Sequence, residues 1–182
     1  MNKVEPIRNI VQLNQMKENL KKMNEKYYIL FEIGVNSGLR VSDLRKLQVK
    51  DVKYGDYIYI TEQKTGKNKR FLLNAHVRQE VMEYITRNKL NDDDYIVQSQ
   101  KGINQPLSRV QVYHVLNLAA EGFGIRIGTH TMRKTFGYWH YQRYQDVAML
   151  QMIFNHSSPS VTLRYIGISD DMIDATLREF YI

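Results

Sequence analysis

Hydrophobic residues recur at helical spacing through most of the chain. In the first such segment the apolar positions, three or four residues apart, are Leu13, Met16, Leu20 and Met23. This pattern predicts an amphipathic helix. The next segment, residues 26–36, is apolar nearly all round, which is typical of a buried central helix. Gly38 is suited to end that helix, because glycine readily adopts the left-handed conformation found beyond helix C-termini.

Two short segments in the middle of the chain have the composition of β-strands. Residues 57–61 and 70–73 are rich in β-branched and aromatic side chains. The turn between them, residues 64–69, is basic and contains a glycine, which favours a hairpin. Residues 95–97 are a candidate for a further short strand. With helices on either side, the predicted fold is mainly α with a small antiparallel β-sheet (α+β).

A helix-capping residue precedes each of the later apolar stripes. The predicted N-caps are Asn74, Ser108, Thr129, Asp146 and Ser158. In the helix after Thr129, we expect the apolar face to consist of Met132, Phe136 and Trp139. A final helix is predicted within residues 169–182, where one stripe contains Met172, Ile173, Thr176, Leu177 and Phe180.

Composition narrows the class of protein. The 182 residues are 43% hydrophobic, enough for one compact domain with a core. A net charge of +7 and a pI near 9.5 favour a polyanionic partner such as nucleic acid. The absence of cysteine excludes disulfides, thiolate metal sites and cysteine nucleophiles. There is no apolar signal core and no run approaching the ~20 apolar residues of a membrane span, so we expect a cytoplasmic protein.

Charged residues at two predicted helix starts are candidates for binding a phosphate. Arg40 precedes Asp43 by about one helical turn, so the carboxylate could fix the direction of the arginine. The two could equally form an ordinary surface ion pair. His130 and Arg133 share one face of another helix start, where backbone N–H groups favour an anion. The alternative is a capping histidine with a surface arginine.

Three further residues complete the candidate chemistry. Tyr165 lies nine residues after His156, near the end of a short helix that begins at Ser158 and Pro159. A tyrosine beside a histidine suggests a phenolic nucleophile with a polar partner, although a tyrosine near a helix end is usually a packing residue. Lys64, in the basic turn, either belongs to a solvated hairpin end or is placed against a phosphate.

In this order, the candidate residues resemble the catalytic domain of the tyrosine recombinases, the phage integrase and Xer group. The resemblance covers nearly the whole chain, and the matching residues are Arg40, Asp43, Lys64, His130, Arg133, His156 and Tyr165. The chain departs from the family pattern at two places. Lys134 stands where a second histidine is frequent, and Phe154–Asn155 replaces the usual Leu-Gly before the late histidine.

The resemblance implies a site-specific DNA recombinase that requires neither a metal nor another cofactor. Tyr165 would attack a DNA phosphate and form a 3′-phosphotyrosine, leaving a free 5′-hydroxyl. Arg40 and Arg133 would bind the non-bridging oxygens, which suit the planar fork of a guanidinium group. His130 would accept the phenolic proton, because an ordinary tyrosine with a pKa near ~10 is protonated at neutral pH.

The other matched residues have supporting roles under this resemblance. Lys64 would protonate the leaving 5′-oxygen, and His156 would hydrogen-bond the phosphate. Asp43 would hold Arg40 or His130 in position. No metal site is expected, because the five histidines show no His-Glu-x-x-His spacing.

Residues 1–182 are expected to form a single catalytic domain. Full-length family members usually carry an N-terminal core-binding domain of ~100 residues, and none is visible in this sequence. The chain would then be an excised fragment or a short member of the family. The implied partner is double-stranded DNA, on which a monomer or dimer would assemble into a homotetramer. The last helix would dock either on its own domain or on a neighbouring protomer.

Two other functions fit the same residues. A DNA-binding regulator could keep this fold without cleaving, although the full set of partners around Tyr165 argues against it. A type IB topoisomerase-like enzyme would use the same chemistry to nick and close one strand. A covalent-complex assay separates the regulator from the recombinase, and relaxation of supercoils without strand exchange would favour the topoisomerase.

Overall fold

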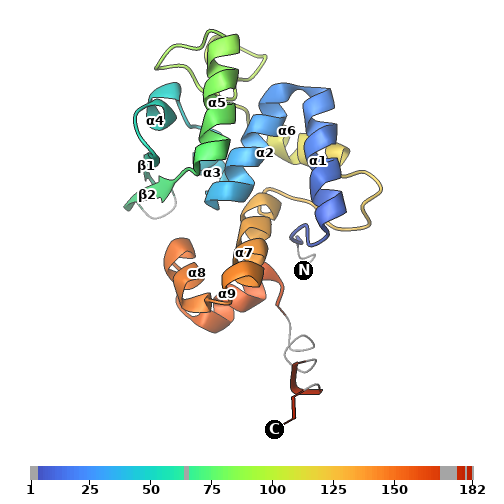
Figure 1. Cartoon of the computed structure of the whole chain (residues 1–182). Coiled ribbons are helices and arrows are strands. Elements are labelled where there is room, and N and C mark those ends of the chain that lie inside the picture. Colours follow the sequence, from blue (N-terminus) through green and yellow to red (C-terminus); the bar gives the residue numbers. More distant parts are fainter. Residues whose placement is uncertain (1–3, 64–65, 169–175, 179, 182) are drawn as a thin grey trace.

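The structure, a computed structural model, describes residues 4–63, 66–168, 176–178 and 180–181. In chain order its elements are α1 (Ile10–Met23), α2 (Glu25–Ser37), α3 (Val41–Leu44), α4 (Val49–Lys53), β1 (Tyr57–Thr61), β2 (Asn68–Leu72), α5 (Ala75–Arg87), α6 (Arg109–Ala119), α7 (Thr131–Tyr144), α8 (Val147–Phe154) and α9 (Pro159–Ile166). Figure 1 shows α1, α2, α5 and α6 gathered in one part of the molecule, with α7 leading from it to α8 and α9. The predicted class, mainly α with a small antiparallel sheet, is confirmed.

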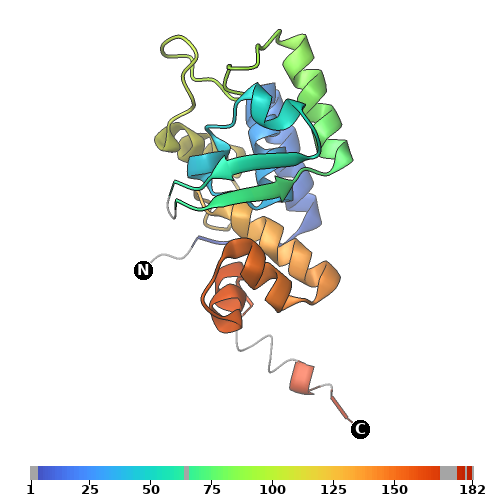
Figure 2. The ribbon, with the colours of Figure 1, turned by 90° about the vertical axis from the view of Figure 1, so that its left-hand side faces the viewer.

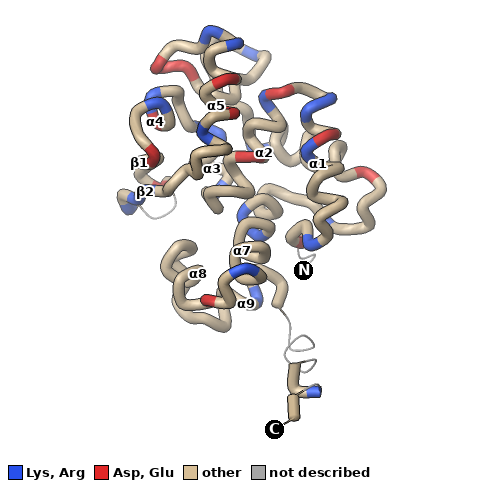
Figure 3. The backbone as a smooth tube through the Cα atoms, in the orientation of Figure 1, with Lys and Arg blue, Asp and Glu red and all other residues tan. Residues whose placement is uncertain are grey.

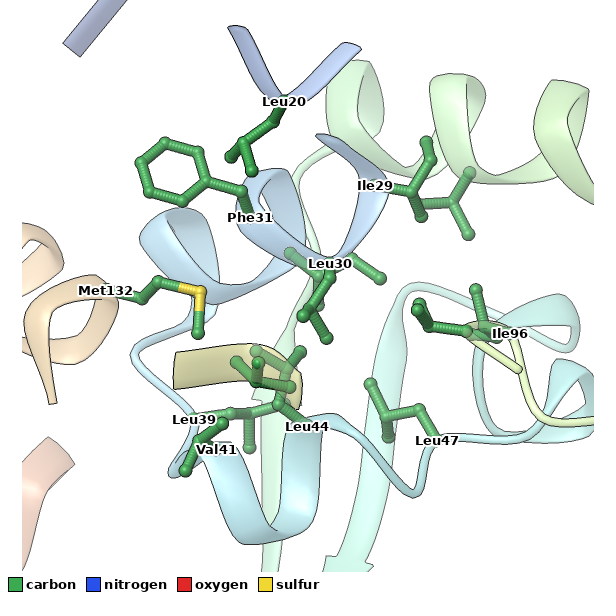
Figure 4. Packing of buried hydrophobic residues seen from close by; sticks show 14 of the residues in the cluster. Leu20, Ile29, Leu30, Phe31, Leu39, Val41, Leu44, Leu47, Ile96 and Met132 are labelled. Atoms are coloured by element: carbon green, nitrogen blue, oxygen red, sulfur yellow. The ribbon is translucent and has the colours of Figure 1, made fainter. Parts of the chain in front are cut away.

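Helix α2 is the centre of the larger hydrophobic core, as its all-round apolar sequence predicted. Its apolar residues within 29–33 are at most 2% exposed. Gly38 ends the helix with a φ of 66°, in the left-handed conformation that was expected. Figure 4 shows this stretch packed between Leu20 of α1 and Met132 of α7. The start of α7, which carries two of the candidate residues, is therefore fixed to the core.

The two strands form an antiparallel hairpin that lies in front of the helices in Figure 2. Ile58 pairs with Phe71, and both side chains are buried against the core. Strand β2 begins at residue 68, two residues before the predicted start. The further strand suggested at residues 95–97 is wrong, because Tyr95 makes only an isolated bridge to Gln48.

Helices α8 and α9 pack on α7 through a second, smaller core. Its fully buried members are Leu150, Phe154 and Ile166. The close approach depends on Gly137 of α7, where a Cβ atom would lie 2.6 Å from Ile166 Cγ2 and 2.7 Å from Phe154 Cε2. This contact places α9, the helix of Tyr165, directly against the helix of His130 and Arg133.

Most of the local predictions for the helices are confirmed. The predicted caps that accept a hydrogen bond from the first turn are Asn74, Ser108, Asp146 and Ser158. Two predictions are wrong: Met23, at the last turn of α1, is 36% exposed, and α7 is preceded by His130 instead of Thr129. None of the described helices is both long and apolar enough to cross a membrane.

Two short helices were missed from the sequence, and one predicted helix lies mostly outside the described residues. The short helices α3 and α4 were not predicted as separate elements. The predicted final helix falls mostly outside the described residues, including Met172 and Ile173 of its stripe.

Candidate active site

Tyr165 lies in the last turn of α9. Ser158 begins this helix, and its hydroxyl accepts a hydrogen bond from Val161 N at 3.3 Å. Gly167 ends the helix with a φ of 85°. The helix presents the Tyr165 hydroxyl to His130, whose Nδ1 lies 3.1 Å away. The predicted nucleophile and the predicted base are therefore within hydrogen-bonding distance, although they are 35 positions apart in the chain.

Arg133 lies one turn further along α7 and is only 3% exposed. Its Nη1 donates a hydrogen bond to Gly38 O, and its Nη2 donates to Phe154 O at 3.0 Å. The guanidinium also lies over the Phe154 ring, 4.4 Å from the ring centre. The alternative of a surface arginine is wrong, because Arg133 joins the end of α2 to the end of α8 beside Tyr165.

The electrostatics of the site act on the phenol in two directions. Burial raises the pKa of Tyr165, whereas the charges of Arg133 and Arg40 lower it. The net effect is a raised pKa, so the phenol keeps its proton at neutral pH and needs an acceptor before it can attack. Burial also lowers the pKa of Arg133, but a guanidinium remains charged in proteins. A buried cation therefore faces the predicted nucleophile, which favours an anionic substrate.

Arg40 and Arg133 meet at a cavity of about 310 Å³. Arg40 immediately precedes α3 and lines this cavity together with Arg133 of α7. His130 and Arg109, the first residue of α6, also line it. Several cationic or hydrogen-bonding groups thus surround one space, an arrangement that fits a phosphate.

The carboxylate that holds Arg40 is Glu62, not Asp43. Arg40 Nη1 forms a hydrogen-bonded ion pair with Glu62 Oε1, and the Glu62 side chain is 1% exposed. Asp43 is also buried, but its Oδ1 accepts the backbone N–H of Gln63 at 3.2 Å. The prediction that Asp43 holds Arg40 is therefore wrong, and the alternative that Asp43 holds His130 stays a prediction. Asp43 instead supports the chain where it leaves β1.

Lys69, on β2, is a second residue near the site that the sequence did not single out. Its Nζ donates to Ile153 O at 3.1 Å and lies 3.8 Å from Glu62 Oε1. Burial lowers the pKa of Lys69, and the Glu62 charge opposes that shift. The predicted hairpin lysine, Lys64, lies outside the described residues. Lys69 was missed because only the hairpin pairing turns this side chain toward the site.

His156 packs edge-on against Tyr165, with ring centres 5.0 Å apart. Burial and the nearby charges of Arg133 and Arg40 lower the pKa of His156 to about 4, so the imidazole is neutral at physiological pH. Its Nδ1 lies 3.1 Å from Thr162 Oγ1. Since the Thr162 hydroxyl donates to Ser158 O, Nδ1 acts as the donor in this contact.

Lys134, the residue that departs from the family pattern, contributes another cation. Its side chain is buried, and its Nζ lies over the Tyr165 ring, 4.9 Å from the ring centre. Although Lys134 departs from the family pattern, it still contacts the predicted nucleophile, Tyr165. Within the described part of the chain, no group of three His, Cys, Asp or Glu side chains is placed to hold a metal ion.

Comparison with known proteins assigns this arrangement to a family. The model of the phage integrase family matches residues 7–172. The chain belongs to this family. It is 44% identical over 181 residues to the Probable integrase/recombinase YoeC of Bacillus subtilis, which is 99% of this chain and 98% of that protein. The tyrosine recombinase XerA of Pyrococcus furiosus is 25% identical over 150 residues, 81% of this chain and 51% of XerA.

Comparison with solved structures shows that this chain has the fold of the Xer recombinases. The crystal structure of XerA recombinase superimposes with a TM-score of 0.76 at 17% identity, over 100% of this chain and 66% of that one. XerH bound to its palindromic difH substrate gives a TM-score of 0.73 at 22% identity, over 97% and 54%. The chain thus spans about half the length of several Xer relatives. The predicted family, the tyrosine recombinases, is confirmed.

Proposed function

We propose that this phage integrase family member cleaves and rejoins DNA as a site-specific recombinase, with Tyr165 as the nucleophile. The observation that carries the proposal is the Tyr165 hydroxyl, 3.1 Å from His130 Nδ1 and beside the buried Arg133. Phosphoryl transfer depends mainly on positioning and on cations that stabilise the phosphate oxygens. A base and two arginines around one cavity, with the nucleophile hydrogen-bonded to the base, meet that requirement.

The chemistry exchanges one phosphate ester for another. The Tyr165 oxygen bonds to phosphorus as the bond to the 5′-oxygen breaks, which leaves a 3′-phosphotyrosine and a 5′-hydroxyl. His130 Nδ1 takes the phenolic proton, and Arg40 and Arg133 bind the non-bridging oxygens. Because the ester bond is conserved, a 5′-hydroxyl can reverse the step without ATP.

Two residues assist the exchange in this proposal. Lys64 supplies the proton that the leaving 5′-oxygen takes up. His156 presents its Nε2 to the phosphate, since its Nδ1 is engaged by Thr162. A phosphate dianion-like transition state next to Nε2 would raise the pKa of His156 from about 4, so that the ring can become a donor when charge develops.

Double-stranded DNA is the proposed substrate, and a homotetramer on DNA is the proposed active assembly. Among the structural neighbours, a lambda integrase tetramer is bound to a Holliday junction, with a TM-score of 0.71 at 15% identity. The net charge of +7 and the spread of Lys and Arg over most helices (Figure 3) suit a polyanion. We place the activity in the cytoplasm, where the DNA substrate is found.

Replacing the proposed nucleophile tests this function. Protein is incubated with a pool of short random-sequence duplexes, stopped with detergent, and the DNA that remains attached to protein is sequenced. When cleavage occurs close to a 3′ end, the short released strand diffuses away and the covalent adduct is trapped. Tyr165→Phe removes only the attacking hydroxyl, so we expect no adduct. Tyr54→Phe is the matched control, because Tyr54 is 66% exposed on another part of the chain.

The other outcomes distinguish the alternatives. Undiminished adduct from Tyr165→Phe would remove Tyr165 as the nucleophile. DNA binding by the wild-type chain without any adduct would identify a regulator. Relaxation of a supercoiled plasmid carrying two selected sites, without exchange between them, would identify a topoisomerase-like enzyme.

A further inference from the structure

Glu62 is a buried carboxylate at the edge of the proposed active site to which the mechanism above assigns no role. Its side chain is 1% exposed. The backbone at Glu62 is fixed by the hairpin turn, since Glu62 N donates to Lys67 O at 3.0 Å and Gly66 N donates to Glu62 O at 2.8 Å. A carboxylate removed from water in this way requires positively charged partners.

The partners of Glu62 are cations of the site. Its Oε1 accepts a hydrogen bond from Arg40 Nη1 and lies 3.8 Å from Lys69 Nζ. Glu62 also acts on Arg133, because its charge raises the pKa of that guanidinium against the effect of burial. Among the described residues, one buried anion thus acts on three cations, of which Arg40 and Arg133 line the cavity.

The geometry of Arg40 shows what the ion pair can do. A guanidinium carries five N–H groups in a rigid planar fork. Glu62 engages Nη1, and the hydrogen bonds of the described residues leave Nε and Nη2 of Arg40 available. Since Arg40 lines the cavity beside His130 and Arg133, a bond on one branch of the fork orients the other branch toward a bound phosphate.

We propose that Glu62 is a positioning residue that aims Arg40 at the phosphate being cleaved. This inference rests on the proposed function, and it deepens it by naming the group that sets the angle of one phosphate-binding arginine. The opposite possibility is that Glu62 competes with the phosphate for Arg40. The two differ in sign, because removing a competitor would speed cleavage and removing a positioning group would slow it.

The experiment compares Glu62→Gln with wild type on a duplex selected in the adduct assay. Glutamine keeps the shape of the side chain and its acceptor oxygen but removes the charge, so the hydrogen bond that directs Arg40 loses its charge assistance and holds the guanidinium less firmly. We expect the initial rate of adduct formation to fall about a hundredfold, as for a small misplacement of a reacting or binding group. DNA affinity should change little. Glu32→Gln is the matched control, because Glu32 is also buried and pairs with Lys17 at 2.7 Å, away from the cavity.

A second substrate separates positioning from general support of the fold. A methylphosphonate at the cleaved position replaces one charged non-bridging oxygen by a methyl group, so less positive charge is needed there. If Glu62 acts through Arg40, the ratio of wild-type to Glu62→Gln rates should shrink to a few-fold on this substrate. In an Arg40→Ala background, Glu62→Gln should add no further loss. A ratio equal on both substrates would mean a structural role and overturn the proposal.

The remaining outcomes also decide whether Glu62 positions Arg40. Faster adduct formation by Glu62→Gln, or a rate equal to wild type, overturns the proposal while leaving Tyr165 chemistry intact. Failure of the wild-type chain to form adduct would instead overturn the proposed function itself. If Glu62→Gln does not fold, Glu62→Asp is tested in its place. Aspartate keeps the negative charge, but its side chain is one methylene shorter, so the carboxylate lies further from Arg40. An intermediate loss that shrinks on the methylphosphonate supports positioning, and an unchanged rate contradicts it.

Discussion

Arg133 combines a structural role with a proposed chemical role in one side chain. It is 3% exposed, donates to the carbonyl oxygens of Gly38 and Phe154, and lies over the Phe154 ring. The first carbonyl belongs to the end of α2 and the second to the end of α8. The same guanidinium faces Tyr165 and influences its pKa. A residue of this kind cannot be replaced without affecting both the fold and the reaction.

We therefore expect Arg133→Ala to destabilise the chain as well as abolish cleavage. Two buried carbonyl groups lose their donor, and leaving such groups unsatisfied costs about 1–3 kcal/mol each. Chemical unfolding should show a loss of about 2–6 kcal/mol. Arg143→Ala on the exposed end of α7 is the control and should stay within about 0.5 kcal/mol of wild type. Equal stability of the two variants would contradict the structural role of Arg133.

For single residues, type and order in the sequence were sufficient to predict most of the side chains that the structure brings together at the site. The structure brings Arg40, His130, Arg133, His156 and Tyr165 together around the cavity and the phenol. Glu62 was missed because its pairing with Arg40 spans 22 positions and depends on where the hairpin returns. Asp43 was assigned to Arg40 because the two residues are three positions apart, which suggested a side-chain contact. In the structure, Asp43 Oδ1 instead accepts a hydrogen bond from the backbone N–H of Gln63.

Among the elements, the contact of α7 with α9 determines whether Tyr165 reaches His130. The two helices touch at Gly137, whose missing side chain admits Ile166 and Phe154. Ile166 is the neighbour of Tyr165 in sequence. A change in the spacing of these helices should therefore be transmitted directly to the phenolic oxygen.

Gly137→Ala tests this contact. An alanine inside a helix is normally favourable by about 1 kcal/mol relative to glycine. Here the added Cβ would lie 2.6 Å from Ile166 Cγ2, and overpacking of a core costs about 1–3 kcal/mol. We expect a net loss of stability and a lower rate of adduct formation, measured by unfolding and by the adduct assay.

Gly34→Ala is the comparison for this variant. Its Cβ would meet Met132 Sδ at 2.7 Å and Leu44 Cδ2 at 3.0 Å, but these are the ends of flexible side chains, which can move aside more easily than the Phe154 ring beside Gly137. We expect a smaller loss of stability and little change in cleavage. If Gly137→Ala matched the wild type in both measurements, the helix contact would not control the position of Tyr165.

The elements that the sequence predicted best are those with long hydrophobic periodicity or a clear cap. Helices α1, α2 and α5 to α9 belong to this group. The short helices α3 and α4 have four and five residues, which is too little sequence for a periodic pattern. Tyr95 illustrates the converse, because its β-branched neighbours suggested a strand, but among the described residues Tyr95 makes only an isolated bridge to Gln48.

In the whole molecule, the site lies where the two hydrophobic clusters meet. The larger cluster is centred on α2 and supports Arg40, while the smaller one holds Phe154 and Ile166 and supports Tyr165. Helix α7 contributes to both and carries His130 and Arg133 between them. No single segment of sequence contains this arrangement, so composition and periodicity could predict its parts but not their distances.

The tail is the part of the molecule in which assembly can be tested. Beyond α9, the described apolar residues Leu177, Phe180 and Tyr181 are 64%, 68% and 96% exposed. Apolar side chains at a chain end are stabilised by packing on a surface, either of the same protomer or of a neighbour. Donation of the tail from each protomer to the next would close a ring, which the resemblance to tyrosine recombinases implies for a tetramer on two DNA sites.

A chain that ends at Ile168 should therefore fold and bind DNA but fail to assemble. This end keeps α9 intact, because Ile168 N donates to Leu163 O at 2.9 Å. Light scattering with paired-site DNA should show four protomers for the intact chain and fewer for the shortened one, with adduct formation on a single site retained. Leu177→Lys in the intact chain is a second, milder variant, since it replaces one exposed apolar side chain of the tail and should weaken the same assembly. A shortened chain that assembles and recombines like the intact one would show that the tail packs on its own domain.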